Sequence, residues 1–177
     1  MAFLSPGHRC DWKDTLKALN GHKYILVAID YFIKWVEAAS YSILKAKHVA
    51  WFIDNNIICQ YGVPQEIIFD NGSHFEREVR TIMELYNIEH HKSSPFRPQT
   101  NGAIKAADKN IRNILAKMVV AYKDWVEKLL FALWGYKTSI RASTRVTPYS
   151  LIYGSEAVLP IEVEIQSLRV LAKTKAL

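Results

Sequence analysis

Residues 65–75 read QEIIFDNGSHF, and this stretch decides the fold that we expect. An isoleucine-rich run leads directly into Asp70, and the Asn-Gly pair after it makes a tight exit. Upstream, apolar residues recur at helical spacing from position 45 and stop at Gly62 and Pro64. A strand that follows a crossover helix favours parallel addition to a sheet. Asp70 is then expected at the carboxyl end of its strand, where α/β sheets usually carry their chemistry.

The pattern on either side completes a mixed α/β domain. Residues 23–30, KYILVAID, and residues 34–41, KWVEAASY, read as the two strands of a hairpin to which the Asp70 strand is added. His90 and His91 read as a short strand before a polar, proline-broken loop, and they lack the carboxylate or cysteine partners of a metal site. Helices are expected at 45–61, 75–86, 104–118 and 125–139, and a helical turn at 147–154.

Composition is typical of one intracellular domain. With 177 residues and 50% hydrophobic content the chain can build one full-sized core. Cys10 and Cys59 are too isolated to indicate disulfides or a zinc site. No apolar run reaches the roughly 18 residues of a membrane span, so we expect no membrane partner. The net charge of +6 is compatible with a nucleic-acid partner, although many basic proteins bind none.

Lys105, 35 residues after Asp70, stands where a phosphodiester-cutting site of this pattern needs its last carboxylate. Divalent ions are held between carboxylates, whereas an ammonium group is a rival cation. Asp70 alone is weak evidence, because Asp-Asn-Gly is also an ordinary turn. Whether Asp70 belongs to a functional site therefore depends on the motifs that surround it in the sequence.

Several long strings give the sequence a specific resemblance. GHKYILVAIDYFIKWVEA, YGVPQEIIFDNGSHF, HHKSSPFRPQTNG, DWVEKLLFALWGYKTSIRASTRVTPYSLIYG and EAVLPIEVEIQSLRV occur in this order within residues 20–171. Together they resemble the integrase catalytic core of a plant gypsy-type LTR retrotransposon polyprotein. The resemblance implies a ribonuclease H-like fold, with a mixed five-stranded sheet flanked by helices. It also implies two aspartates and a glutamate that bind magnesium to cut and join DNA.

The three acids carry over unevenly. Asp70 matches the second aspartate in its Asp-Asn-Gly setting. The third acid belongs to the family pattern Asn-Gly-x-x-Glu-Ala, in which Asn101, Gly102 and Ala106 are present while Lys105 holds the glutamate position. We expect Asp70 to pair with Lys105 and no magnesium to be bound.

The first aspartate should lie in a strand before residue 20, where the chain reads GHRCDWKD at residues 7–14. This segment is neither apolar nor β-branched, but a shifted reading frame of the family's codons produces it. Our hypothesis is a frame error that damages the first strand and leaves a marginal fold. Genomic DNA that cannot be read in another frame as an apolar strand with Asp would contradict it. Asp11, Asp14 and Asp108 are possible stand-ins, but each requires displaced ligands.

The resemblance implies DNA as partner and magnesium as the ancestral cofactor. Basic and polar residues near the expected site are candidates for phosphate contacts, although a solvated helix face explains them as well. The aromatic residues of 125–139 indicate either core packing or a homodimer surface. The candidates for nucleic-acid contacts are Lys92, Arg97, Gln99, Asn101, Lys105, Lys109 and Arg112.

These observations divide the chain into an aberrant segment 1–19, an integrase core-like domain 20–145 and its extension 146–177. They predict a nucleic-acid-binding, catalytically inactive integrase core-like domain, nuclear if functional, whose ancestral role was DNA integration by metal-dependent strand transfer. The alternatives are a domesticated module that binds DNA or protein without catalysis, or a non-functional remnant of the element.

Overall fold

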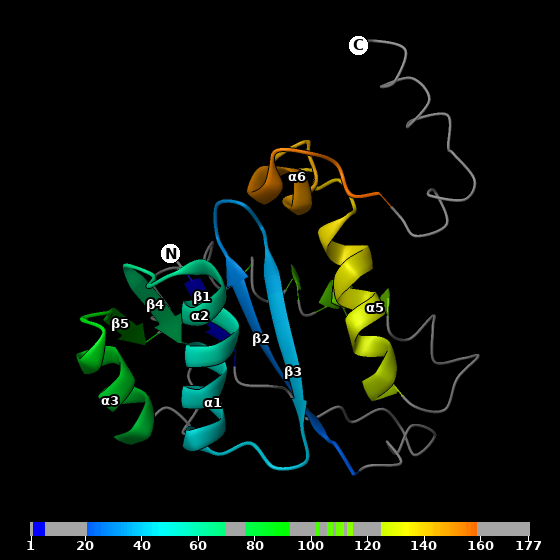
Figure 1. The fold of residues 1–177 in the computed structure, drawn as a ribbon. Helices are drawn as coiled ribbons and strands as arrows, with labels where there is room; N and C mark the ends of the chain where they lie inside the picture. Colours follow the sequence, from blue (N-terminus) through cyan, green and yellow to red (C-terminus); the bar gives the residue numbers. More distant parts are fainter. Residues whose placement is uncertain are drawn as a thin grey trace, which may run out of the picture.

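The computed structural model describes residues 2–5, 21–69, 77–92, 102, 106–107, 109–111, 113–114 and 125–158. Five strands form one mixed sheet in the order β3-β2-β1-β4-β5. Helices lie against both faces of the sheet (Figure 1). The strands are β1 (Ala2–Ser5), β2 (Tyr24–Asp30), β3 (Val36–Tyr41), β4 (Glu66–Phe69) and β5 (Glu89–Lys92). The mixed five-stranded sheet is confirmed.

The central strand of the sheet is β1. It pairs antiparallel with β2, with Leu4 opposite Ala28, and parallel with β4, with Leu4 opposite Phe69. We expected the damaged first strand to cost the sheet a central member, and this loss is not found. The four residues of β1 precede residues 7–14, which lie outside the described residues. The strand is short beside the seven residues of β2.

The hairpin and the parallel strands follow the sequence pattern with one correction. β2 and β3 pair antiparallel, as predicted, with Val27 opposite Ala38. We expected β4 to add directly to this hairpin, but it pairs with β1 and with β5, parallel to both. The prediction was wrong because it left out β1, whose backbone occupies the place beside β2. His90 and His91 lie on β5, as expected.

One face of the sheet is covered by the helices that precede and follow β4. They are α1 (Ala46–Phe52), the π-helix η1 (Ile53–Ile58), α2 (Cys59–Tyr61) and α3 (Arg77–Leu85). The helical run ends at Gly62, whose φ of +85° suits a residue without a Cβ. Phe52 and Ile53 are fully buried against Leu26 and Ile67 of the sheet. The π-helical turn inside the predicted helix was not anticipated from the sequence.

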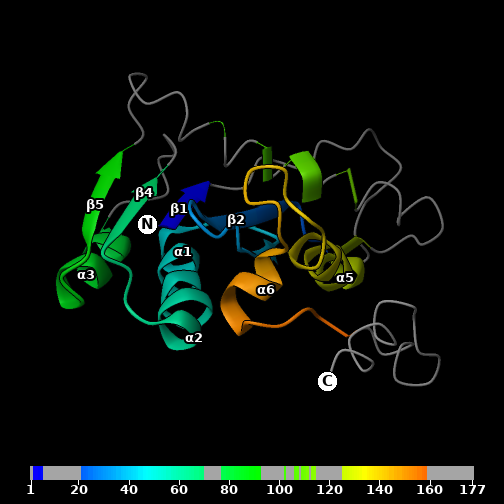
Figure 2. The same ribbon diagram turned by 90° about the horizontal axis from the view of Figure 1, so that it is seen from above.

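The opposite face of the sheet is covered by α5 (Trp125–Lys137) and by helical residues between positions 102 and 114. Figure 2 shows these short helical pieces on the side of the sheet away from α1 and α2. Ala107 and Ile111, each 1% exposed, pack with Ile68 of β4 and with α5 in one core. The predicted long helices are thus present, the first only as far as its described residues show.

Alternation along β2 explains the three layers. Ile25, Val27 and Ile29 point into the core beneath α5, while Leu26 and Ala28 point into the core beneath α1. A strand buried on both faces reads as a continuous apolar run, which is what residues 25–29 show. The last helix, α6 (Pro148–Tyr153), begins at Thr147, whose side chain accepts a hydrogen bond from Ser150 N at 3.0 Å. In the described part of the chain, none of the helices has the length and apolar character that crossing a membrane requires.

Leu4→Pro tests whether β1 holds the sheet together. Proline has no backbone N–H and is excluded from the middle of a sheet. We expect the Leu4→Pro chain to lose the cooperative thermal transition in circular dichroism. Leu4→Ala removes more of the side chain than proline does but keeps the N–H, and it should retain the transition. A Leu4→Pro chain that melts like the unchanged chain would show that β1 is dispensable.

Candidate functional site

The candidate site lies on the side of the sheet formed by the carboxyl ends of three parallel strands, called here the candidate edge. β1, β4 and β5 run in the same direction, so Ser5, Phe69 and Lys92 close the strands at one edge. Phe69 is 3% exposed and anchors the end of β4 in the core beneath α1. Asp70 follows Phe69 directly in the chain and itself lies outside the described residues.

Of the residues predicted to contact nucleic acid, some are described by the structure and others lie outside the described residues. Lys109 is exposed on a helical stretch whose buried residues, Ala107 and Ile111, pack on the sheet. The backbone of Lys92 ends β5, and its side chain is not described. The structure therefore brings the end of β5 to the candidate edge and directs Lys109 to solvent. Outside the described residues lie Arg97, Gln99, Asn101, Lys105 and Arg112, together with the possible stand-ins Asp11, Asp14 and Asp108.

Histidines near this edge have the surface character that their sequence setting indicated. His90 and His91 are both exposed. His91 Nε2 lies 3.9 Å from a carboxylate oxygen of Glu66 and 4.0 Å from one of Glu89, in an exposed setting where such pairs contribute little. Within the described residues, no group of three or more His, Cys, Asp or Glu side chains is placed to hold a metal ion.

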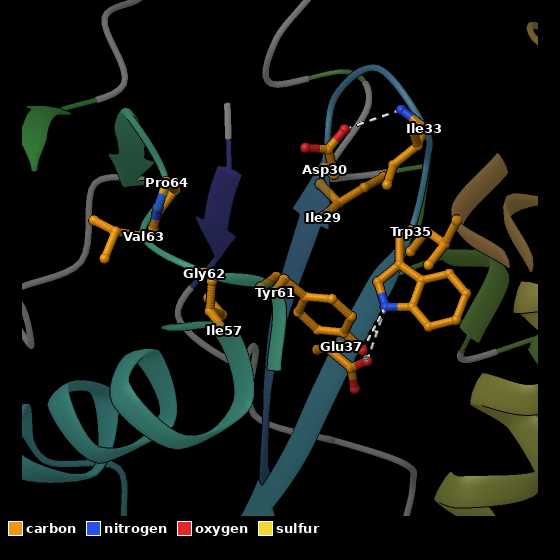
Figure 3. Close-up of a pocket in the computed structure, with 12 residues that line it drawn as sticks. Ile29, Asp30, Ile33, Trp35, Glu37, Ile57, Tyr61, Gly62, Val63 and Pro64 are labelled. Atoms are coloured by element: carbon orange, nitrogen blue, oxygen red, sulfur yellow. Dashed lines mark hydrogen bonds between the residues drawn. The ribbon is translucent and has the colours of Figure 1, made fainter. Parts of the chain in front are cut away.

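A polar cluster that the sequence did not reveal lies at the other end of the molecule, beside the edge strand β3. Three donors converge on Oε1 of Glu37. They are Nζ of Lys137 at 2.6 Å, the hydroxyl of Tyr61 at 2.6 Å and Nε1 of Trp35 at 2.9 Å. Figure 3 shows the Tyr61 ring turned toward Glu37 and Trp35. The cluster joins α2, β3 and α5 through one carboxylate oxygen.

The surroundings of this cluster explain its strength. The side chains of Glu37 and Lys137 are only 12% and 13% exposed, so their charges meet largely out of water. Lys137 Nζ also lies 4.3 Å from the centre of the Trp35 ring, a cation–π contact. Burial, together with the hydrogen bond to Glu37, raises the pKa of the Tyr61 hydroxyl well above its usual value, so this group stays a donor.

Sequence reasoning missed the cluster because its members are distant along the chain. Tyr61 and Lys137 lie 24 and 100 positions from Glu37. The one available signal was a glutamate inside a strand of otherwise apolar and small residues, VEAASY. Such a glutamate is usually solvent-exposed, and only the packing of α5 over the edge of β3 turns it inward.

The chain is similar to the Pol polyprotein of Radiation murine leukemia virus (strain Kaplan), with 31% identity over 158 residues, 84% of this chain. It is similar also to the Gag-Pol polyprotein of Feline leukemia virus, with 30% identity over 82% of this chain. The matched parts are 27% and 9% of those polyproteins, so the chain spans well under a third of the relatives' length. No family model matches the chain.

Solved structures define the fold class. The catalytic core domain of BIV integrase matches with a TM-score of 0.66 and 22% identity, over 84% of this chain and 91% of that one. The HTLV-2 integrase catalytic core domain in complex with magnesium matches with a TM-score of 0.65 and 18% identity, over 84% and 93%. An intasome of simian T-cell lymphotropic virus in complex with PP2A regulatory subunit B56 gamma matches with a TM-score of 0.71 and 18% identity, over 89% and 56%.

The fold is therefore the ribonuclease H-like fold of retroviral integrase catalytic cores. In sequence, the chain is similar to retroviral Pol polyproteins over more than four fifths of its length. The similarity thus points to the integrase catalytic core within such polyproteins.

Lys137→Met tests the Glu37 cluster. Methionine keeps the apolar stem of lysine but leaves the buried Glu37 without its cation, and removing one partner of a buried pair costs about 3 kcal/mol. We expect this loss in the free energy of unfolding measured in urea. Lys47→Met, at an exposed position of α1, is the matched control and should stay within about 0.5 kcal/mol of the unchanged chain. Equal effects would mean that the cluster contributes nothing.

Proposed function

We propose that this chain is a plant gypsy-type retrotransposon integrase core-like domain that binds DNA and has lost catalysis. The observation that carries the proposal is Lys105, which occupies the glutamate position of an otherwise matching Asn-Gly-x-x-Glu-Ala pattern. The integrase-core fold supports it, because the scaffold of the ancestral reaction is present. Long terminal repeats or a reverse transcriptase beside the gene would support this origin, and their absence together with steady transcription would favour the domesticated module described below.

Magnesium does not fit the residues present. Two-ion phosphodiester chemistry needs several carboxylates around the ions, and of the three positions only Asp70 retains one. The lysine ammonium brings a positive charge to the place of a ligand. Asp108 stands three residues after Lys105, and helical rise would displace its carboxylate by about 4.5 Å along the axis. The ancestral strand transfer therefore has no metal-binding set in this chain.

DNA binding does not need the lost acids. A polyanion is attracted by lysine and arginine side chains, and such contacts supply most sequence-independent affinity. The chain carries a net charge of +6, and Lys109 is exposed on the helical stretch that follows the candidate edge. We assign phosphate contacts to this surface, with Lys92, Arg97, Lys105 and Arg112 as the further cations. A DNA-bound role is expected in the nucleus, which imaging of a tagged chain tests.

A homodimer is supported by the outer side of α5. Trp125, Leu129 and Leu133 are buried against the sheet, which confirms core packing for part of the aromatic and apolar set. Leu130 and Phe131, however, are 74% and 59% exposed. Adjacent exposed apolar residues on a long helix are typical of an interface. Solved relatives include an HTLV-2 core in a trimeric form, which is a property of that protein.

A domesticated module that binds DNA or protein without catalysis is the alternative. It is favoured by the intact cores on both faces of the sheet, which persist although the acid pattern does not. If the chain is a remnant without function, we expect no steady transcription of its gene. Steady transcription outside any element would support domestication, and silence would support the remnant.

Lys105→Glu tests the proposed loss of the metal site. We expect the unchanged chain to show no rise in melting temperature with magnesium. The variant, with two carboxylates, should gain roughly 3–6 °C at ten times its Kd. Lys109→Glu makes the same charge change one helical turn away and should gain nothing. A magnesium-dependent rise or strand-transfer product in the unchanged chain would show that the site is functional.

Lys109→Ala tests DNA binding. We expect the affinity for duplex DNA, measured by fluorescence anisotropy, to fall with salt. Removing one phosphate contact should reduce the slope of log K against log salt by about 0.9. Lys47→Ala, on a helix covering the other face of the sheet, should leave the slope unchanged. Binding without salt dependence would contradict the assigned phosphate contacts.

Phe131→Asp tests the homodimer. A buried aspartate cannot be accommodated in an apolar interface, so we expect sedimentation equilibrium to give a monomer for the variant and a dimer for the unchanged chain. Phe32→Asp, at an exposed position of the β2–β3 turn, should remain dimeric. This interface would be excluded if the unchanged chain were still a monomer at 100 times the protein concentration used in the DNA-binding assay.

A further inference from the structure

A pocket of about 190 Å³ lies beside the Glu37 cluster, at the turn between β2 and β3. Its walls come from segments far apart in the sequence: Asp30 and Ile33 of the hairpin, Tyr61 and Val63 at the end of α2, and Ile152 of α6. Figure 3 shows the labelled lining residues arranged around this space, with the hairpin on one side and Val63 and Pro64 on the other. The pocket is therefore built by the tertiary fold.

This pocket is separate from the candidate edge of the sheet. β2 runs antiparallel to β1, so Asp30 lies beside Ala2, at the amino end of β1. Residues 62–64 precede β4, whereas Asp70 follows it. The pocket thus lies at the amino ends of the parallel strands, and the DNA-binding surface proposed above lies toward their carboxyl ends.

The walls of the pocket are largely apolar and firmly held. Ile29 and Trp35 are 2% and 6% exposed, and Ile57 adds a third buried wall. Trp35 and Tyr61 are fixed in mutual T-shaped contact, with ring centres 6.0 Å apart, and both donate to Glu37. A preformed aromatic wall lowers the entropy cost of binding a flat ligand.

Glu37 also gives the pocket a hydrogen-bond acceptor. All three donors that reach this carboxylate use Oε1. Its second oxygen, Oε2, accepts no hydrogen bond from any residue that the structure describes. The Glu37 side chain is only 12% exposed, and a carboxylate oxygen without a protein donor favours a ligand with an O–H or N–H group over one without.

Pocket size limits the ligand to about one ring. An apolar cavity of about 150 Å³ is enough to bind benzene, whereas drug-sized ligands occupy roughly 300 Å³ or more. We infer that the pocket binds a small monocyclic aromatic molecule that donates one O–H or N–H hydrogen bond to Glu37. This ligand site is independent of the metal and DNA chemistry proposed above.

Phenol and its methyl ether, anisole, test the inference on the unchanged chain. The two probes have nearly the same apolar body, but only phenol can donate. Titration is followed by the Trp35 indole N–H signal in proton–nitrogen NMR spectra, assigned by its loss in Trp35→Phe. We expect a saturable shift with phenol, with Kd on the order of 1 mM, and binding of anisole weaker by about tenfold.

Ile152→Trp provides the second arm, because the larger ring fills the pocket from α6. This variant should abolish the phenol-dependent shift. Ile140→Trp, at an exposed position that does not line the pocket, should bind phenol as the unchanged chain does. Absence of a saturable shift up to 20 times the expected Kd would overturn the proposal, as would equal affinity for anisole or full binding by a folded Ile152→Trp chain.

Discussion

The double pairing of β1 is the constraint on which the rest of the structure depends. Four residues, Ala2–Ser5, bond to β2 on one side and to β4 on the other, and no other strand links the hairpin to β4 and β5 in the described sheet. Both cores cross this junction, since Ile68 of β4 packs with residues of β2 beneath α5, and Ile67 packs with Leu26 beneath α1. Backbone hydrogen bonds of one short strand thus align two apolar faces at once, and helices on either side are stabilised only when that alignment holds.

At the open edge of the same sheet, the Glu37 cluster plays a different part. Among the described strands, β3 has a neighbour on one side only, and an open edge invites pairing with other chains. Lys137 reaches from α5 to Glu37 and Tyr61 reaches from α2, so the two helical layers meet beside β3 through a single carboxylate. The ion pair between Lys137 and Glu37 is directional and largely buried. It therefore fixes the position of α5 relative to β3 more specifically than apolar packing alone.

Much of this fold was readable from the sequence, and the exceptions have physical causes. The hairpin, β4 and α5 follow from local periodicity, because a strand or helix of ordinary length carries its pattern within itself. β1 did not, since four residues are too few for a periodic signal and the segment that follows them reads as neither strand nor helix. The Glu37 cluster joins residues up to 100 positions apart. Of the candidate site, Asp70 and Lys105 were singled out by their spacing and by the family patterns around them, and Lys109 as a basic residue near the expected site. The structure adds that Lys109 is exposed on a helical stretch.

If the chain has lost catalysis, as proposed above, the separation between the apolar cores and the acidic positions explains how the fold is retained. In the described residues both cores consist of apolar side chains from the sheet and helices, and stability arises from their burial. Converging carboxylates repel one another when no cation is bound, so a site of that kind lowers stability rather than raising it. A lysine at one of the three positions replaces repulsion by attraction. Under the proposed function, a change from glutamate to Lys105 would remove a metal ligand and leave the forces that hold the sheet untouched. The response to magnesium, not stability itself, therefore reports on catalysis.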